Sequence, residues 1–303
     1  MIQRLILASA ALLSGHAAIA QSLPADLSID QRVRTQLPGL SPDEELKEAI
    51  MTGEDDIILL RKSKLFTLTG GINWTNSSNA FLSPGTSRDD NYFVADAGLR
   101  VATRIADKVN LFAGVGVATV RYLRFTELDY SALNGIVGAS LNVGRVDTSL
   151  TYQPSMIFNR DFGSRQLTQH RFGLSAGIPF RIKRAVVNLS ARGERTLTDP
   201  DDYRSWAVGG DVALQIPLTP NGKILAFANA GAERRWYDSY FPGLVGVDRR
   251  DTKIDGTAGL RWRIKPWLDA SAQVSYQRNK STSDVNGYRA WQGMVGVSLN
   301  SRF

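Results

Sequence analysis

From residue 65 to the end of the chain, polar residues alternate with apolar or small ones. In the first such segment one parity holds Phe66, Leu68, Gly70, Ile72 and Trp74, and the other holds Thr67, Thr69, Gly71, Asn73 and Thr75. The last segment repeats the pattern, with apolar or small residues at Trp291, Gly293, Val295, Val297, Leu299, Ser301 and Phe303. A period of two predicts β-strands with one apolar and one polar face.

Twelve such segments can be counted. We place them roughly at 65–76, 91–105, 108–124, 131–143, 145–158, 166–179, 184–197, 203–217, 222–237, 251–264, 266–279 and 287–303. A soluble β-sandwich or propeller is the alternative, but its strands are usually only about five or six residues long.

The spacers between the segments alternate between short and long. The short ones contain turn residues, as in Ala106-Asp107, Val143-Gly144-Arg145 and Lys265-Pro266. The long ones are polar and span 77–90, 125–130, 159–165, 198–202, 238–250 and 280–286. Short turns at one end, long loops at the other and an even strand number are typical of transmembrane β-barrels. We therefore predict an all-β fold, a closed antiparallel up-and-down barrel of about 12 strands over 65–303, with both of its ends on the short-turn side.

The first twenty residues have the features of an export signal. Arg4 supplies a positive charge, Leu5 to Leu13 form a short apolar run, and Ala18 and Ala20 fit a small-x-small cleavage site. The run is too short to span a bilayer, which needs roughly 20 residues. A buried N-terminal helix is the alternative. Cleavage after Ala20 predicts export from a bacterial cytoplasm and, with the barrel, an outer-membrane location.

Residues 21–64 form an acidic leader. It carries nine acids and six bases, a net charge of −3. Ser41 as N-cap, Pro42 in the first turn and Glu44 closing a capping box predict one short helix near 42–51. We expect a periplasmic tail, which places the N-terminus in the periplasm; the alternative is a plug in a pore.

Composition excludes several kinds of chemistry. The 303 residues include no cysteine and two histidines, and His16 lies in the predicted signal. Cysteine-based metal sites and nucleophiles are therefore excluded, as is a site with several histidine ligands. The formal charge of +7 is interleaved with acids, so we predict no nucleic-acid partner. We also expect no metal and no cofactor.

Aromatic residues gather near the predicted strand ends. Such residues commonly form girdles at the two membrane interfaces of a barrel. We assign to these girdles Trp74, Tyr92, Phe93, Tyr122, Tyr130, Phe158, Tyr203, Trp206, Trp236, Tyr237, Trp262, Trp267, Tyr276, Tyr288 and Trp291. Phe303, on the apolar parity of the last segment, is predicted to be the assembly signal that the barrel assembly machinery reads.

Several short runs carry a resemblance to a family. The chain has Asn73-Trp74-Thr75-Asn76, Asp89-Asp90-Asn91-Tyr92, Leu99-Arg100, Arg121-Tyr122 and Leu128-Asp129-Tyr130. With these diffuse motifs, most of 65–303 resembles Gram-negative outer-membrane porins of the porin-2 type, often encoded beside exopolysaccharide export genes. The resemblance implies an outer-membrane channel or export pore and polysaccharide-export components as partners. It supplies no catalytic residues.

The polar parity of the segments should face the barrel lumen. Its charged members, which are the candidate pore residues, are Asp96, Arg100, Arg104, Asp147, Arg171, Arg192, Glu194, Asp211, Glu233, Arg235, Asp255, Arg261, Arg263 and Asp269. We assign Gln153, Asn188, Gln215, Asn229, Gln273 and Gln277 to the same face, with no lysine and almost no large apolar residue. The arginines and acids would either pair with one another and stiffen the barrel or guide charged sugars through it.

Three functions remain open. The first is a channel for hydrophilic solutes or an extended polysaccharide. The second is a non-conducting structural or adhesive barrel whose loops bind a partner. The third is a lipid hydrolase, for which His170 would need a hydroxyl nearby, with Ser164, Thr168 and Ser175 as candidates. We expect no enzyme, because Phe172 occupies the next position on the face of His170.

The charged loop residues suggest two surface interactions. The loop acids near Asp89, Asp199 and Asp248 could bind calcium, but they lack an EF-hand spacing, so we favour solvated acids. The expected lipid partner is lipopolysaccharide, through phosphates that meet Arg160, Arg165, Arg249, Arg250 and Lys280.

Overall fold

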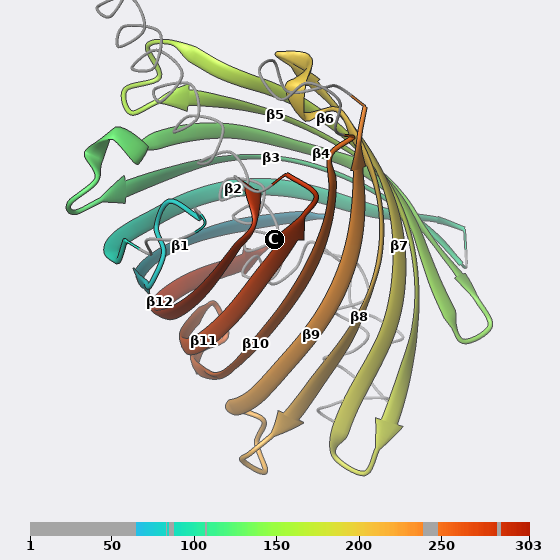
Figure 1. The fold of residues 1–303 in the computed structure, drawn as a ribbon. Coiled ribbons are helices and arrows are strands. Elements are labelled where there is room, and N and C mark those ends of the chain that lie inside the picture. Colours follow the sequence, from blue (N-terminus) through green and yellow to red (C-terminus); the bar gives the residue numbers. More distant parts are fainter. Residues whose placement is uncertain (1–64, 83, 85–87, 107, 239–247, 284–285) are drawn as a thin grey trace, which may run out of the picture.

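The computed structural model describes residues 65–303, apart from 83, 85–87, 107, 239–247 and 284–285. The predicted signal, the leader and its helix lie outside these residues. Within them, twelve antiparallel strands form one closed barrel (Figure 1). The strands are β1 (Phe66–Ser77), β2 (Asp90–Ala106), β3 (Val109–Tyr122), β4 (Tyr130–Val143), β5 (Val146–Asn159), β6 (Arg165–Ile182), β7 (Ala185–Asp199), β8 (Ser205–Pro217), β9 (Ile224–Tyr237), β10 (Arg250–Lys265), β11 (Leu268–Ser281) and β12 (Tyr288–Arg302). The predicted fold and strand number are confirmed.

Each strand pairs with its neighbours in the chain, and β1 closes the barrel against β12. This seam runs from Thr67 opposite Arg302 to Ser77 opposite Gln292. At its end Phe66 and Phe303 exchange two backbone hydrogen bonds, of 3.1 and 3.0 Å, and their rings stack with centroids 5.9 Å apart. Closure satisfies the backbone donors and acceptors of both outermost strands, which an open sheet would leave exposed.

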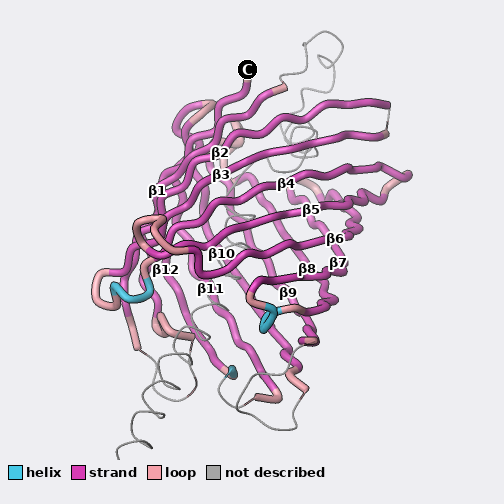
Figure 2. The backbone as a smooth tube through the Cα atoms, turned by 90° about the horizontal axis from the view of Figure 1, so that it is seen from above, coloured by secondary structure: helices cyan, strands magenta, loops and turns pink. Residues whose placement is uncertain are grey.

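The connections alternate in length as the spacers predicted, except around β8, where the loop before the strand is no longer than the turn after it. Short turns join β2 to β3, β4 to β5, β6 to β7, β8 to β9 and β10 to β11. Gly144 and Gly222 take positive φ angles of 64° and 63° in two of them, a backbone conformation that suits glycine. The other loops are longer than the two-residue turns, but those at 160–164 and 200–204 are no longer than the β8–β9 connection at 218–223. Short 3-10 helices at Thr126–Leu128 and Asp201–Tyr203 lie in two of these loops (Figure 2). No helix of the described residues is long and apolar enough to cross a membrane.

The outer surface is covered by large apolar side chains. Exposed examples on β1 and on β3 to β6 are Ile72, Val115, Val137, Leu150 and Leu174, with 55 to 67% of each residue accessible. A water-soluble monomer seldom exposes so large a continuous apolar surface. The exterior therefore matches a lipid-facing surface.

The aromatic girdle prediction is wrong for six tyrosines. Tyr92, Tyr122, Tyr130, Tyr203 and Tyr288 are all less than 9% exposed. Tyr237 has the inward parity of β9, opposite the buried Ser205, and its hydroxyl donates to Asp251 at 3.4 Å. Their strand or loop positions turn them inward, whereas the six tryptophans are all exposed on the outside. Clustering near strand ends could not separate these groups, because an inward tyrosine and an outward tryptophan occur at the same height.

Candidate functional site in the barrel interior

The pairing register defines which residues face the barrel interior. Residues directly opposite one another in a ladder share one face of the sheet, so the inward face can be followed from strand to strand. The buried Asn73 lies opposite Val94, and Val94 lies opposite Val120. Followed round the barrel, this face includes all fourteen charged pore candidates. It also includes the six predicted amides.

Six of these residues form an interior ion-pair network on β6–β9. Its members are Arg171, Arg192, Glu194, Asp211, Glu233 and Arg235. Arg235 bridges Glu194 at 3.1 Å and Glu233 at 2.9 Å. Arg171 approaches Glu194 at 3.4 Å, and Arg192 links Glu233, at 3.2 Å, to Asp211. The sequence left open whether the interior arginines and acids pair with one another or guide charged sugars. These six residues pair with one another.

Small residues of β8 leave space for the side chains of the network. Ala207 of β8 lies between Glu194 and Arg235 in the ladder, and Gly209 lies between Arg192 and Glu233. A Cβ atom on Gly209 would sit 3.3 Å from the Arg192 guanidinium carbon. Long side chains of β7 and β9 can therefore meet across β8, which presents little bulk between them.

A second polar group, the Asp251 cluster, lies at the long-loop end. Asp251 accepts hydrogen bonds from Ser281 at 2.6 Å, Asn279 at 3.1 Å and Arg249 at 2.7 Å. The Arg249 guanidinium lies 4.0 Å from the ring centroid of Tyr237. Arg249, predicted to meet lipid phosphate, is instead 7% exposed and fixes Asp251 inside the barrel, so that prediction is wrong.

The other predicted residues differ in their surroundings. Arg263 lies 3.8 Å from Asp269, and Asp255 lies 3.9 Å from Lys253. Lys253 faces inward opposite Glu233, which corrects the prediction of an interior without lysine. Arg100 is 4% exposed and stacks 4.6 Å over the Phe112 ring. Within the described part of the chain, Arg104 and Arg261 form no ion pair.

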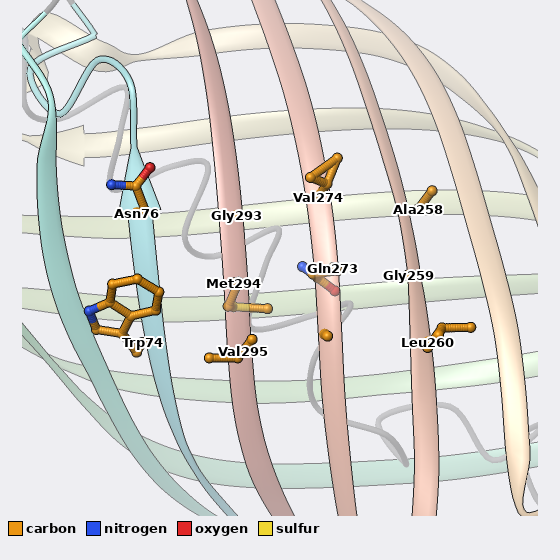
Figure 3. Close-up of a pocket in the computed structure, with 11 residues that line it drawn as sticks. Trp74, Asn76, Ala258, Gly259, Leu260, Gln273, Val274, Gly293, Met294 and Val295 are labelled. Atoms are coloured by element: carbon orange, nitrogen blue, oxygen red, sulfur yellow. The ribbon is translucent and has the colours of Figure 1, made fainter.

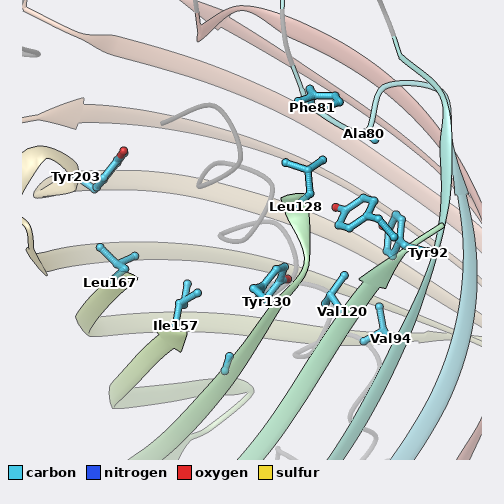
Figure 4. Close-up of a cluster of buried hydrophobic side chains, with 12 residues drawn as sticks. Ala80, Phe81, Tyr92, Val94, Val120, Leu128, Tyr130, Ile157, Leu167 and Tyr203 are labelled. Atoms are coloured by element: carbon cyan, nitrogen blue, oxygen red, sulfur yellow. The ribbon is translucent and has the colours of Figure 1, made fainter. Parts of the chain in front are cut away.

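The interior also contains an apolar cluster that the sequence analysis missed. Twelve buried residues compose it: Ala80, Phe81, Tyr92, Val94, Val120, Tyr122, Leu128, Tyr130, Ala132, Ile157, Leu167 and Tyr203. Figure 4 shows those from β2 to β6 pointing inward, where Phe81, Leu128 and Tyr203 from the loops lie near them. The prediction of almost no large apolar residue in the lumen is therefore wrong for the long-loop end of β2–β6. The signal was available: Tyr92, Val94, Val120 and Tyr122 occupy the otherwise polar parity.

His170 lies on the outer face rather than in the interior. Its Nδ1 is 2.8 Å from the hydroxyl of Tyr152, and the two rings stack. Ser175 and Leu167 of the same strand have the opposite parity, and Ser175 bonds Ser149 at 2.7 Å. The structure thus gives His170 a tyrosine partner and separates it from one of the proposed nucleophiles.

Two of the loop acids named above as calcium candidates have partners within the protein. Asp90 accepts backbone hydrogen bonds from Arg124 and Phe125, and Asp199 is bonded by Arg165 at 3.2 Å. No group of three or more potential metal ligands occurs among the described residues.

Comparisons with known proteins show the fold. No family model and no curated protein sequence matches the chain. An outer membrane channel from Pseudomonas putida F1 is similar in structure, with a TM-score of 0.51 and 11% identity over 80% of this chain and 100% of that one. The translocator domain of the autotransporter NalP from Neisseria meningitidis aligns with a TM-score of 0.42 and 13% identity, over 85% and 95% of the two chains. LpxR from Salmonella typhimurium aligns with a TM-score of 0.44 and 11% identity, over 76% of this chain and 99% of that one. The chain has the fold of outer-membrane β-barrels.

Proposed function

We propose that the protein is an outer-membrane channel that passes hydrophilic solutes or an extended polysaccharide. One observation carries the proposal: the inward faces of β10 and β11 are polar along the whole length of the strands. On β11 the face consists of Asp269, Ser271, Gln273, Ser275, Gln277, Asn279 and Ser281, and on β10 only Gly259 is not polar. An apolar exterior around such a polar wall suits a hydrated path through lipid.

The polar wall offers hydroxyl and amide groups at every level. Because each is a weak hydrogen-bonding partner, a sugar chain would exchange contacts along the wall without being captured at one point. The free guanidinium groups of Arg104 and Arg261, near the short-turn end, would attract anions into the interior. The paired arginines of the interior ion-pair network would instead hold the wall's shape.

Conductance across a planar lipid bilayer tests the proposal. The wild-type protein should conduct ions, and Arg261→Ser with Arg263→Ser should shift selectivity away from anions. Arg278→Ser removes a positive charge from the outer face and serves as the matched control, with unchanged selectivity. Absence of conductance in the correctly folded wild-type barrel would contradict the channel.

The interior apolar cluster favours a second function, a closed barrel that acts as a scaffold or adhesin through its loops. It occupies inward positions of β2–β6 at the long-loop end and includes loop residues. If it closes the mouth, the variant Phe81→Ala with Leu128→Ala should conduct where the wild type does not. Equal conductance of the two proteins would remove this alternative.

We propose an orientation and partners to go with this function. The short-turn end, with the N-terminus, faces the periplasm, and the long loops face outward. The barrel assembly machinery recognises the last strand through Phe303, and polysaccharide-export components meet the periplasmic end. The channel requires no catalytic step.

A further inference from the structure

The outer face of the barrel carries a basic group near the long loops. We call Arg234, Arg278, Lys280 and Arg289 the outer basic cluster; all four are exposed. Arg278 of β11 lies directly opposite Arg289 of β12, and Thr252 lies between Arg234 and Lys280 in the ladder. Like charges placed opposite one another in a sheet destabilise it unless a counter-charge is bound.

Three other arginines at this end have acidic partners. Arg165 lies 3.2 Å from Asp199, and Arg124 lies 3.8 Å from Asp89. Arg195 bonds Asp238 at 2.8 Å, and this hydrogen bond lowers the pKa of the Asp238 carboxyl. Among the residues that the structure describes, no acid pairs with any member of the outer basic cluster. Its positive charge is therefore available to a ligand.

An aromatic pair and an apolar groove lie below the cluster on the same strands. Tyr276 and Trp291 are opposite one another, with ring centroids 4.7 Å apart. The next outward positions are Val274 and Gly293, which line a shallow groove of about 400 Å³ (Figure 3). Most of its lining residues have outward parity, and Trp74, Leu260 and Val295 bound its smaller residues. Along each strand, the arginine of the pair lies four residues from the residue that lines the groove, which is a distance of roughly 13 Å.

We propose that this face of β10–β12 binds one phosphorylated, acylated lipid of the outer leaflet, the lipid A part of lipopolysaccharide. Guanidinium groups bind phosphate oxygens through paired hydrogen bonds, and the small residues of the groove receive an acyl chain. The order of charge, aromatic pair and apolar groove matches the order of phosphate, interface and hydrocarbon in such a lipid. A soluble anion has no apolar chain that could bind in the groove. This inference rests on the outer-membrane location in the proposed function, but not on conductance.

Native mass spectrometry of the folded full-length protein in detergent micelles tests the proposal. Bisphosphorylated lipid A should bind at least about tenfold more tightly than dephosphorylated lipid A or phosphatidylethanolamine. Arg278→Ser with Arg289→Ser should remove this preference, and Arg165→Ser is the matched control with no effect. Equal binding by the double variant and the wild type would overturn the proposal.

A second variant separates the lipid from free phosphate. Nothing lies within 4 Å of a Cβ atom on Gly293, so Gly293→Leu can fold while it fills the groove. It should weaken binding of lipid A and leave any binding of inorganic phosphate unchanged. Unchanged lipid A affinity would rule out the groove. A heat-modifiable band verifies that each variant is folded, and conductance, measured separately, tests the channel.

Discussion

At the residue scale, glycine decides where interior side chains can lie. Asn73 of β1 extends over Gly296 of β12, so that a Cβ atom on this glycine would collide with the Asn73 side-chain oxygen. Phe112 covers Gly138 in the same way, and its ring would collide with a Cβ atom there. Gly293, on the outer face of β12, has open space beside it. Two glycines of one strand thus differ completely in what a methyl group would meet.

We therefore expect Gly296→Ala to destabilise the seam between β1 and β12 by about 1–3 kcal/mol, through overpacking. Gly293→Ala should change the free energy of unfolding little. Urea titration of the folded protein in detergent measures both. The double variant Asn73→Ser with Gly296→Ala should recover most of the loss, and failure to recover would contradict the contact with Asn73.

The interior ion-pair network supplies a second prediction at this scale. Arg235 lies between the buried Glu194 and Glu233, so its removal leaves two neighbouring buried carboxylates without their shared cation. Arg235→Ala should destabilise the barrel by about 3–5 kcal/mol, as measured by unfolding in detergent. Arg104→Ala, which removes an exposed arginine of the interior face, is the control. If Arg235→Ala and Arg104→Ala change the free energy of unfolding equally, the network does not stabilise the barrel.

At the scale of the element, alternation along a strand separates lipid from interior. Val295 and Ser298 of β12 have opposite parity: Val295 lies opposite the exposed Trp74, and Ser298 lies opposite the buried Asp269. Val295→Arg should destabilise by about 2–4 kcal/mol if the site is near the bilayer midplane, whereas Ser298→Arg should be tolerated. Unfolding in lipid vesicles measures the difference. The reverse order would mean that the register is displaced by one residue.

The strands could be predicted because each is a local pattern. Their alternation and the turn residues between them lie within a few positions of one another, so the predicted and observed strand ends differ by only a few residues. The inward positions of Arg192 and Glu233 also follow from parity alone. Their pairing does not, because it depends on the order of strands and on the small residues Ala207 and Gly209 between them.

The interior apolar cluster shows the other limit of the sequence. Parity assigns Tyr92 and Tyr122 to the polar face, whereas their place near strand ends predicts a membrane girdle. These rings belong to one buried cluster with Phe81 and Leu128 of the loops, and loop packing of this kind has no periodic signal. The inward face is polar along β10 and β11 and apolar at the long-loop end of β2–β6. The average polarity of the whole inward face does not show this difference.

At the scale of the whole molecule, closure depends on one long-range pairing. Every other ladder joins consecutive strands, whereas β1 and β12 are paired across the entire barrel. Deletion of Phe303 removes two backbone hydrogen bonds and a stacked ring from this seam. The truncated protein should show less heat-modifiable barrel in the outer membrane than the wild type. Phe303→Leu keeps the backbone bonds and should show a smaller loss; an undiminished level after deletion would contradict the role of the seam.

The adjacency of Phe66 and Phe303 has a consequence for chain connectivity. Because the two residues meet at the short-turn end, a peptide of a few residues could join them as one more hairpin. The chain could then be opened elsewhere, at the turn that contains Gly144, without removing any ladder. A circular permutant of residues 65–303 that begins at Arg145 should retain the same twelve pairings, since such exchanges succeed where ends lie close and the new break falls in an exposed turn. The order in which the strands leave the ribosome would then be free to vary while the barrel stays the same.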